Sequence, residues 1–381
     1  MDTEKNLEKY LSIIVRNVKR AYLFLPDYFP KELLNDKAFM MEAVKREGST
    51  LVHASLELKK DKELVLEAVK NAGKAFRFAA EELKNDKEFV LQAINENYKA
   101  LESASDELKN DKEVVINALN KSGYALQYAS DELKNDKEIV LIAVSKSGDP
   151  FIYASDELKD NKEFVLKILS IPGTAATAFK GASERLRNDK EVVYAAAQIT
   201  KFGNFLEYAS EKIKNDKELI LDILKKCPFH VYYYLSDELK ADKEIAILAV
   251  KADCDALFYA PDNIKNDKDV VYAAASSFKE GLYFASDELK NNREFVLSLL
   301  KVNGVVLEHV PQDFKNDKEL VMAAVNNDGY AIRYASKALK DDKEVALAAV
   351  KSNHDAIWQL SMKLQKDPDI LKAADKKEWM I

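Results

Sequence analysis

Apolar positions recur along this chain at the spacing of one helix face, and the same pattern returns at an interval of about 25 residues, within the range of known repeat architectures. After Asp136, apolar residues stand three, four, seven and eight positions later, with polar residues among them. The same four positions are apolar after an Asp or Asn at fourteen places, except for Asp375 in the final unit. This spacing predicts an amphipathic helix of about ten residues in every unit, which we call helix B.

We call the recurring Asp or Asn the anchor of its unit. The interval between successive anchors is constant from Asp36 to Asn161 and again from Asp242 to Asp367, and it is slightly longer in the middle of the chain. A fixed period of this length, filled with helical pattern, is typical of stacked units that bury their apolar faces only against neighbours. The sequence therefore predicts an all-α solenoid of about fourteen two-helix repeats with polar terminal caps. The anchors are Asp36, Asp61, Asp86, Asp111, Asp136, Asn161, Asp189, Asp216, Asp242, Asp267, Asn292, Asp317, Asp342 and Asp367.

Each anchor is expected to be the N-cap of its helix B, because a short acidic or amide side chain can accept a hydrogen bond from a free amide of the first turn. In the last unit Pro368 follows Asp367, and proline suits the first helical position. Capping alone predicts that asparagine serves as well as aspartate, as at Asn161 and Asn292. Glycine stands twelve residues after the anchor in seven units, where a left-handed residue can end the helix.

A second, shorter helix, helix A, is expected before each anchor. In the unit of Asp136 it covers residues 124–129, and Ser130 begins one more helical turn that leads to the anchor. The position eight before the anchor is aromatic in nine units, from Tyr28 to Tyr334. Stacked one per repeat, these rings are expected to form a continuous internal ladder.

The repeats predict one domain with three parts. Residues 1–24 are charged and lack the repeat, so they are expected to form an N-terminal capping helix. The repeat array covers residues 25–375, with irregular spacing at 162–242, and residues 376–381 form a C-terminal tail.

Charge and hydropathy narrow the classes of partner that the sequence allows. The chain carries 58 Lys and Arg against 65 Asp and Glu, a net charge of -7, and therefore lacks the basic excess that favours nucleic acid. Its longest stretch without charge, residues 168–179, falls short of the roughly 20 apolar residues of a membrane-spanning helix. We therefore expect neither nucleic acid nor membrane as a partner.

The string Tyr-Ala-Ser-Asp-Glu-Leu-Lys-Asn-Asp-Lys-Glu stands whole at residues 128–138 and in pieces throughout, followed by an apolar helix and glycine. It resembles the DUF4116 repeat family over roughly residues 25–370. The resemblance implies a stacked helical fold, and because that family has no assigned function it gives no catalytic residues to carry over. The chain departs from the motif between Asn161 and Asp242, where the spacing loosens and Gly181 replaces the aromatic residue.

The histidines and serines, which could take part in chemistry, have structural explanations. His53 and His309 stand in the aromatic column, His354 in the glycine column and His230 twelve before its anchor, so no two share metal-ligand spacing. The serines mostly repeat in one capping column. We therefore predict no catalytic, cofactor-binding or metal-binding residues and no cofactor.

The two cysteines stand on neighbouring repeats. Cys227 and Cys254 lie eleven and twelve residues after successive anchors, and two cysteines without a disulfide framework are typical of a reducing compartment. Whether these two can pair stays open.

One variable column suggests a binding surface. Nine residues before the anchor, Tyr233, Phe258 and Tyr283 stand on consecutive repeats in a column that is otherwise mostly polar, and Trp358 occupies the same position near the end. Either the loosened spacing lets these rings repack inward, or they form an exposed strip of the residue class enriched at binding hot spots.

Helix B shows a second gradient. Six residues after the anchor, the early units have polar residues such as Glu42, while the later ones have small or apolar residues, beginning with Leu248. Alanine in this column can reflect helix propensity alone. The alternative is that these small or apolar residues form a smooth face on the C-terminal half. Such a face could bind a partner or a second copy of the chain, as a homodimer.

These features favour a non-enzymatic, cytoplasmic scaffold that binds another protein or a peptide. One alternative is a secreted effector of a pathogen or symbiont, delivered to a host cytosol, where it binds a host protein. The other is an enzyme with a site in region 170–236.

Overall fold

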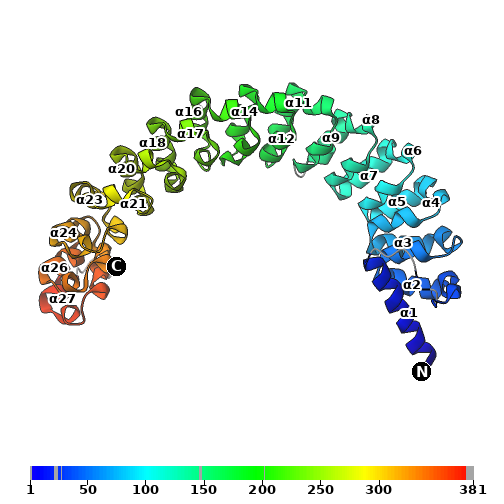
Figure 1. The fold of residues 1–381 in the computed structure, drawn as a ribbon, viewed down its shortest axis with the longest axis horizontal. Coiled ribbons are helices and arrows are strands. Elements are labelled where there is room, and N and C mark those ends of the chain that lie inside the picture. Colours follow the sequence, from blue (N-terminus) through cyan, green and yellow to red (C-terminus); the bar gives the residue numbers. More distant parts are fainter. Residues whose placement is uncertain (1, 21–24, 27, 146–147, 201, 375–381) are drawn as a thin grey trace, which may run out of the picture. The chain divides into compact units, whose positions relative to one another are not determined.

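The repeats are built of short helices stacked side by side along the chain, as the ribbon in Figure 1 shows. From the second repeat onward, each consists of three helical pieces. The computed structural model describes residues 2–20, 25–26, 28–145, 148–200 and 202–374. An A element, usually a 3-10 helix, precedes a one-turn connecting helix, and helix B follows. Apart from one isolated β-bridge between Phe202 and Phe229, the regular structure of these residues is helical. The predicted all-α repeat solenoid is confirmed.

The B helices are the longest elements of the repeats. They have seven to ten residues each and bury their apolar face, as Val114, Val115, Ala118 and Leu119 do in the fourth. Their bounds are α2 (Lys37–Arg46), α3 (Lys62–Asn71), α5 (Lys87–Glu96), α7 (Lys112–Lys121), α9 (Lys137–Val144), α11 (Lys162–Leu169), α14 (Lys190–Ile199), α16 (Lys217–Lys226), α18 (Lys243–Ala252), α20 (Lys268–Ser277), α23 (Arg293–Leu300), α24 (Lys318–Asn327), α26 (Lys343–Ser352) and α27 (Pro368–Ala374).

The A elements and connecting helices are short. The A elements are η2 (Gly48–His53), η4 (Gly73–Phe78), η5 (Tyr98–Ser103), η6 (Gly123–Tyr128), η7 (Asp149–Tyr153), α12 (Ala175–Gly181), η8 (Gly203–Tyr208), η9 (Tyr232–Tyr234), η10 (Cys254–Tyr259), α21 (Glu280–Tyr283), η11 (Gly304–His309), η13 (Gly329–Tyr334) and η14 (His354–Gln359). The connecting helices are η1 (Lys31–Asn35), η3 (Leu58–Lys60), α4 (Glu81–Asn85), α6 (Asp106–Lys109), α8 (Asp131–Lys134), α10 (Asp156–Lys159), α13 (Glu184–Arg187), α15 (Glu211–Lys214), α17 (Asp237–Lys240), α19 (Asp262–Lys265), α22 (Asp287–Lys290), η12 (Phe314–Asn316), α25 (Lys337–Lys340) and η15 (Leu364–Lys366).

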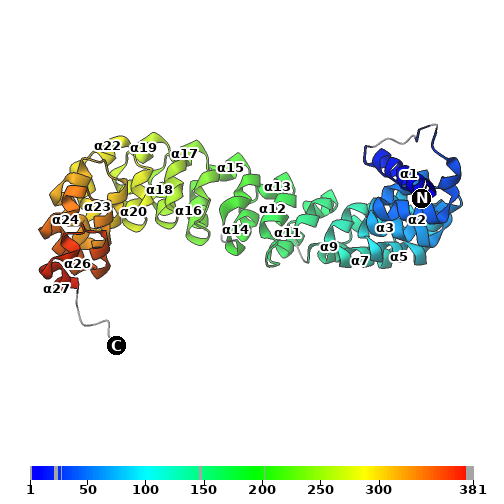
Figure 2. The same cartoon turned by 90° about the horizontal axis from the view of Figure 1, so that it is seen from below.

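The backbone contacts divide the chain into two units, residues 1–196 and 197–381. The boundary falls inside α14, within the region 162–242 where the spacing loosens. In the first unit, α1 (Asp2–Lys19) packs on α2, burying Leu11 and Ile14, in the part of the chain where a capping helix was expected. In the second unit, the connecting helices α15, α17, α19 and α22 follow one edge beside the B helices, as Figure 2 shows.

The A elements differ from the α-helices expected at these positions. Most are 3-10 helices, in which roughly three residues complete a turn. The residues eleven and ten before the anchor enter the core, as Ala125 and Leu126 do in η6. The aromatic column eight before the anchor is not an internal ladder, because Tyr128 is half-buried and Tyr259 and Tyr28 are exposed. The expected ladder was therefore wrong, since the shorter turn leaves these rings at the rim of the core.

The glycine column also has a different role from the expected one. Among the described residues, Gly173 alone of the glycines has a positive φ, of 82°. At Gly48, Gly123, Gly304 and Gly329 the A element closely approaches the helix B of the same repeat: a Cβ added at Gly123 would stand 2.1 Å from the carbonyl oxygen of Ala143 in the helix B that follows. Glycine stands at these positions because a side chain would separate the A element from helix B, not because it ends the preceding helix.

The serine and asparagine of the repeated motif join neighbouring repeats. The Oγ of Ser130 accepts a hydrogen bond from the amide of Leu133 at 3.2 Å and thus caps α8. The same hydroxyl donates to Oδ1 of Asn110 in the preceding repeat at 2.5 Å, and Nδ2 of Asn110 donates to Glu132 at 2.9 Å. These side chains are therefore occupied by structural hydrogen bonds.

The anchors have two functions in the structure. The Oδ1 of Asp136 accepts from the amide of Glu138 at 2.9 Å, and its Oδ2 lies 2.6 Å from Nζ of Lys112 in the preceding repeat. That ammonium group lowers the pKa of Asp136 below its ordinary value of 3.8. A side-chain oxygen accepts from a first-turn amide at every anchor, namely Asp36, Asp61, Asp86, Asp111, Asp136, Asn161, Asp189, Asp216, Asp242, Asp267, Asn292, Asp317, Asp342 and Asp367.

This double role predicts a graded response at Asp136. Asp136→Ala is expected to lower the free energy of unfolding by about 1 kcal/mol from the lost cap, with a further loss from the ion pair. Asp136→Asn keeps the cap and loses only the ion pair with Lys112, so its cost is smaller. Urea melts at pH 7 measure both values.

The pH dependence separates the two contributions at this anchor. Because the pKa of Asp136 is lower in the folded chain, its ion pair stabilises the fold at neutral pH, and this stabilisation disappears as the pH falls below the ordinary value of 3.8. The advantage of aspartate over asparagine should then vanish, while the cost of alanine remains. Equal losses for alanine and asparagine at pH 7 would mean that charge alone explains the column.

Candidate functional site

Three aromatic side chains lie exposed on consecutive A elements of the second unit. Tyr233 in η9, Phe258 in η10 and Tyr283 in α21 have exposed fractions of 48%, 57% and 59%. The position nine before the anchor thus faces outward at these repeats. Of the two interpretations of this column, the structure agrees with the exposed one and not with inward repacking.

The exposed rings rest on rings of the neighbouring column, eight before the anchor. Tyr233 meets Tyr259 of the next repeat at 4.7 Å between ring centroids, Phe258 meets Phe284 at 5.8 Å, and Tyr283 meets His309 at 5.5 Å. Within each repeat the two adjacent rings are in contact at 4.7 to 5.2 Å, edge to face. These contacts form one continuous surface, the aromatic strip: Tyr233, Tyr234, Phe258, Tyr259, Tyr283, Phe284 and His309.

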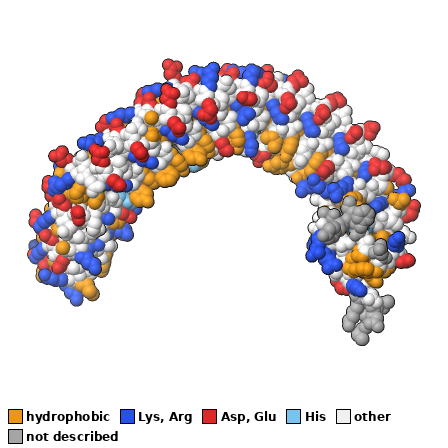
Figure 3. Space-filling view, in the orientation of Figure 1, with side chains coloured by type: hydrophobic (Ala, Val, Ile, Leu, Met, Phe, Trp, Pro, Cys, Tyr) orange, Lys and Arg blue, Asp and Glu red, His pale blue; other side chains and the backbone are white. Residues whose placement is uncertain are grey.

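Lysines of the connecting helices border the aromatic strip. Nζ of Lys265 lies 6.0 Å from the ring centroid of Phe258, and Nζ of Lys290 lies 5.8 Å from that of Tyr283. Figure 3 shows hydrophobic side chains gathered along one edge of this unit, with Lys, Arg, Asp and Glu mixed on the opposite edge. An apolar centre with a charged border is the usual composition of a protein-binding surface.

The other two predicted partner-binding residues lie apart from the aromatic strip. Trp358 in η14 is 72% exposed, but the repeats between it and Tyr283 have Glu308 and Arg333 in the same column. Leu248 is half-buried on α18, on a helix B and not on an A element. The structure thus brings together Tyr233, Phe258 and Tyr283 and leaves these two outside.

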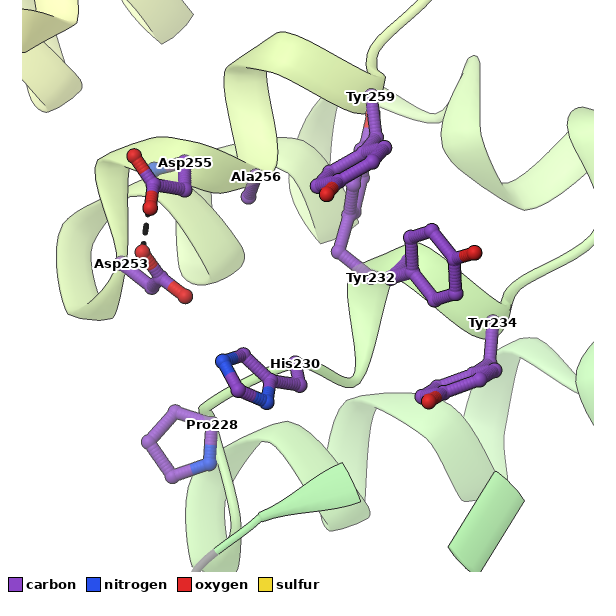
Figure 4. Close-up of a pocket in the computed structure, with 9 residues that line it drawn as sticks. Pro228, His230, Tyr232, Tyr234, Asp253, Asp255, Ala256 and Tyr259 are labelled. Atoms are coloured by element: carbon purple, nitrogen blue, oxygen red, sulfur yellow. Dashed lines mark hydrogen bonds between the residues drawn. The ribbon is translucent and has the colours of Figure 1, made fainter. Parts of the chain in front are cut away.

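A hollow of 370 Å³ opens beside the first ring of the strip, between η9 and η10. Figure 4 shows Tyr234 and Tyr259 on one side, His230 below, and Asp253 and Asp255 on the opposite wall. The residues that line it are Pro228, His230, Tyr232, Tyr233, Tyr234, Asp253, Asp255, Ala256 and Tyr259.

Sequence reasoning did not find this hollow. Asp253 is the N-cap of η10, where its Oδ1 accepts from the amide of Asp255 at 3.1 Å. His230 has a left-handed backbone, with φ of 61°, in a segment where the interval between anchors is longer than the regular one. The loosened spacing was the available signal, and Pro228 in place of glycine in its column was a second one.

Burial favours the neutral forms of both cysteines and of two histidines. Cys227 and Cys254 are free and buried, and burial raises the pKa of both thiols, to about 11 for Cys254. Burial lowers the pKa of His53 and His309, whose Nε2 atoms have no hydrogen-bond partner among the described residues. Neutral thiols are poor nucleophiles, so a structural role in packing suits these groups better than a catalytic one.

No cluster of His, Cys, Asp or Glu able to hold a metal ion occurs in the described ranges. Within the same ranges, no helix combines the length and the apolar character needed to cross a membrane.

The fold and this surface define an α-helical repeat protein with an exposed aromatic strip. The chain belongs to the DUF4116 family, a domain of unknown function, which matches residues 14–59, 61–109, 111–159, 136–176, 161–201, 199–240, 242–290 and 292–340. Six of these matches begin at anchors, namely Asp61, Asp111, Asp136, Asn161, Asp242 and Asn292. Those that begin at Asp61, Asp111, Asp242 and Asn292 each cover about two repeat lengths. Comparison with curated proteins gave no match.

Proposed function

We propose that this chain is a non-enzymatic scaffold that binds another protein, or a peptide, through the aromatic strip. The observation that carries the proposal is the exposure of Tyr233, Phe258 and Tyr283 on consecutive repeats. Exposed rings in one continuous row are uncommon on a monomer and are enriched at binding hot spots.

The packing of the exposed rings against one another supports this function. Each exposed ring is held against a ring of the next repeat, so less side-chain entropy is lost when a partner covers it. The repeated polar residues are engaged in caps and in contacts between repeats, as Ser130 and Asp136 are. In region 170–236, the buried hydroxyl of Thr174 donates to the carbonyl oxygen of Ile168 at 2.7 Å. These groups fit a scaffold better than the alternative of an enzyme in that region.

A triple substitution tests the proposal. Tyr233→Gln, Phe258→Glu and Tyr283→Arg introduce residue types that other repeats have in this column, such as Glu207 and Arg333. A partner recovered from lysate and purified should bind the triple variant at least about 100-fold more weakly than the native chain in calorimetric titration, because three hot-spot rings are lost.

The matched control removes an exposed ring away from the strip. Tyr272, on α20, is 38% exposed, and Tyr272→Gln should leave the affinity unchanged. Urea melts should show only a small stability loss for the triple variant, since exposed substitutions usually change stability little. Native affinity for the triple variant would refute the proposal, and so would a loss of several kcal/mol, which would mean that the rings are core residues.

A further inference from the structure

We propose that the hollow beside Tyr233 receives the guanidinium group of an arginine from the protein partner that lies along the aromatic strip. This inference rests on the proposed function and specifies the chemistry of the partner at one end of its site. It follows from the ring geometry, the unpaired carboxylates and the size of the hollow.

Aromatic rings form one wall of the hollow. Tyr233 lies edge to face against both Tyr234 and Tyr259, with ring centroids 4.7 Å apart in each pair. The three rings therefore present faces in different directions around one space. A cation within about 6 Å of a ring centroid is attracted to the ring face, and the planar guanidinium also stacks on it.

Carboxylates form the opposite wall, and they have no basic partner in the chain. In the described part of the chain, neither Asp253 nor Asp255 forms an ion pair, and no Lys or Arg lines the hollow. By contrast, the neighbouring anchors Asp242 and Asp267 are each paired with a lysine at 2.8 and 2.9 Å. The hollow thus has a negative wall whose counter-charge must come from outside.

The buried thiol of Cys254 is affected by the same negative charge. Burial is the main cause of its raised pKa, and the carboxylates of Asp255, Glu280 and Asp253 raise it further. These charges disfavour a thiolate and favour a cation at this place.

The hollow is large enough to admit one side chain. Sites for drug-sized ligands and cofactors occupy roughly 300–1,000 Å³, so 370 Å³ lies at the small end. Tyr233 and Tyr259 belong both to the hollow and to the aromatic strip. A partner segment on the strip can therefore place one side chain in the hollow. Arginine fits better than lysine because it can stack on the rings and bind a carboxylate through two N–H groups.

A titration with a blocked arginine tests the inference. The full chain is labelled with 3-fluorotyrosine, and the fluorine signals of Tyr233, Tyr234 and Tyr259 are assigned by single Tyr→Phe replacements. Nα-acetyl-arginine methylamide should shift these three signals saturably, whereas its uncharged citrulline counterpart should not. The double variant Asp253→Asn and Asp255→Asn should weaken the binding of the arginine probe about tenfold or more, since hydrogen bonds to charged groups are lost.

The control for charge is Asp262→Asn on α19, an exposed aspartate that does not line the hollow and should leave the titration unchanged. Equal shifts with citrulline, no shift with either probe, or unchanged affinity in the double variant would each overturn the inference.

A second comparison separates this inference from the proposed function. A variant with Phe258→Glu and Tyr283→Arg alters the strip outside the hollow. If this variant loses the protein partner while the Asp253→Asn, Asp255→Asn chain binds it with native affinity, the strip binds a protein and the arginine inference fails. If the partner is lost from both variants, and the arginine probe binds as expected, both conclusions hold.

Discussion

Phe151→Ala is expected to lower the free energy of unfolding by about 3–5 kcal/mol, the usual loss for a fully buried phenylalanine. The side chain of Phe151 in η7 is 0% exposed, and its ring lies 6.3 Å from that of Phe164 in α11. Truncation would therefore remove contacts on both sides of the repeat and leave a cavity. Urea melts monitored by circular dichroism measure the loss.

The next residue along the chain is the control for Phe151→Ala. Ile152 is 39% exposed, and Ile152→Ala should cost much less because little of its surface leaves water on folding. Similar losses at both positions would contradict the core assignment of Phe151.

Phe151 also explains why glycine, and not an aromatic residue, stands at position 181. A Cβ added at Gly181 would stand 2.8 Å from Cδ1 of Phe151, so the phenylalanine occupies the space that a side chain would need. Gly181→Ala should therefore be costly in the native chain and less so when Phe151→Leu is present. Strictly additive losses in this double-mutant cycle would mean that the two positions are independent.

Gly329→Ala is expected to cost about 2–3 kcal/mol, as over-packing of a tight interface does. The new Cβ would stand 2.0 Å from the carbonyl oxygen of Ala349 and 2.8 Å from the amide nitrogen of Asn353. Neither backbone atom can move without shifting α26. Urea melts give the loss, and hydrogen exchange should show weaker protection in α26.

The glycine column supplies its own control. His354 stands at the same position one repeat later with 42% of its side chain exposed, and His354→Ala should change stability by no more than about 0.5 kcal/mol. If Gly329→Ala instead stabilised the chain, as replacing glycine does at an unstrained, open position, close approach would not explain the column.

The features that depend on local chemistry could be predicted from the sequence. The fourteen anchors, the connecting turns and the length of helix B follow from capping and from apolar spacing, which act within a few residues. The role of Gly329 could not be predicted, because it depends on how closely the A element approaches helix B. The position of Tyr128 could not be predicted, because it depends on the 3-10 geometry of the A element. The pairing of Lys112 with Asp136 could not be predicted, because it joins two different repeats.

The candidate site also has a part that the sequence indicated and a part that it did not. The exposure of Tyr233, Phe258 and Tyr283 was one of two alternatives that the sequence left open, and the wheel position nine before the anchor favoured it. The hollow could not be found, because its walls come from two repeats and from the left-handed turn at His230. No pattern within a single repeat places Asp253 opposite Tyr234 of the preceding repeat.

In the regularly spaced parts of the chain, the contact between a lysine and the next anchor has a constant offset along the sequence. Lys62 and Asp86, Lys87 and Asp111, and Lys318 and Asp342 are each separated by 24 residues. Because every such pair links a repeat only to its successor, a copied or deleted stretch of one full period re-forms the same pairs at its junctions. Unequal recombination between similar coding segments could therefore lengthen or shorten this protein by whole repeats. The contacts at the new junction would be ones that the chain already contains. Surface residues such as Phe258 would remain free to diverge in each copy, so a new binding surface can evolve while the framework is inherited intact.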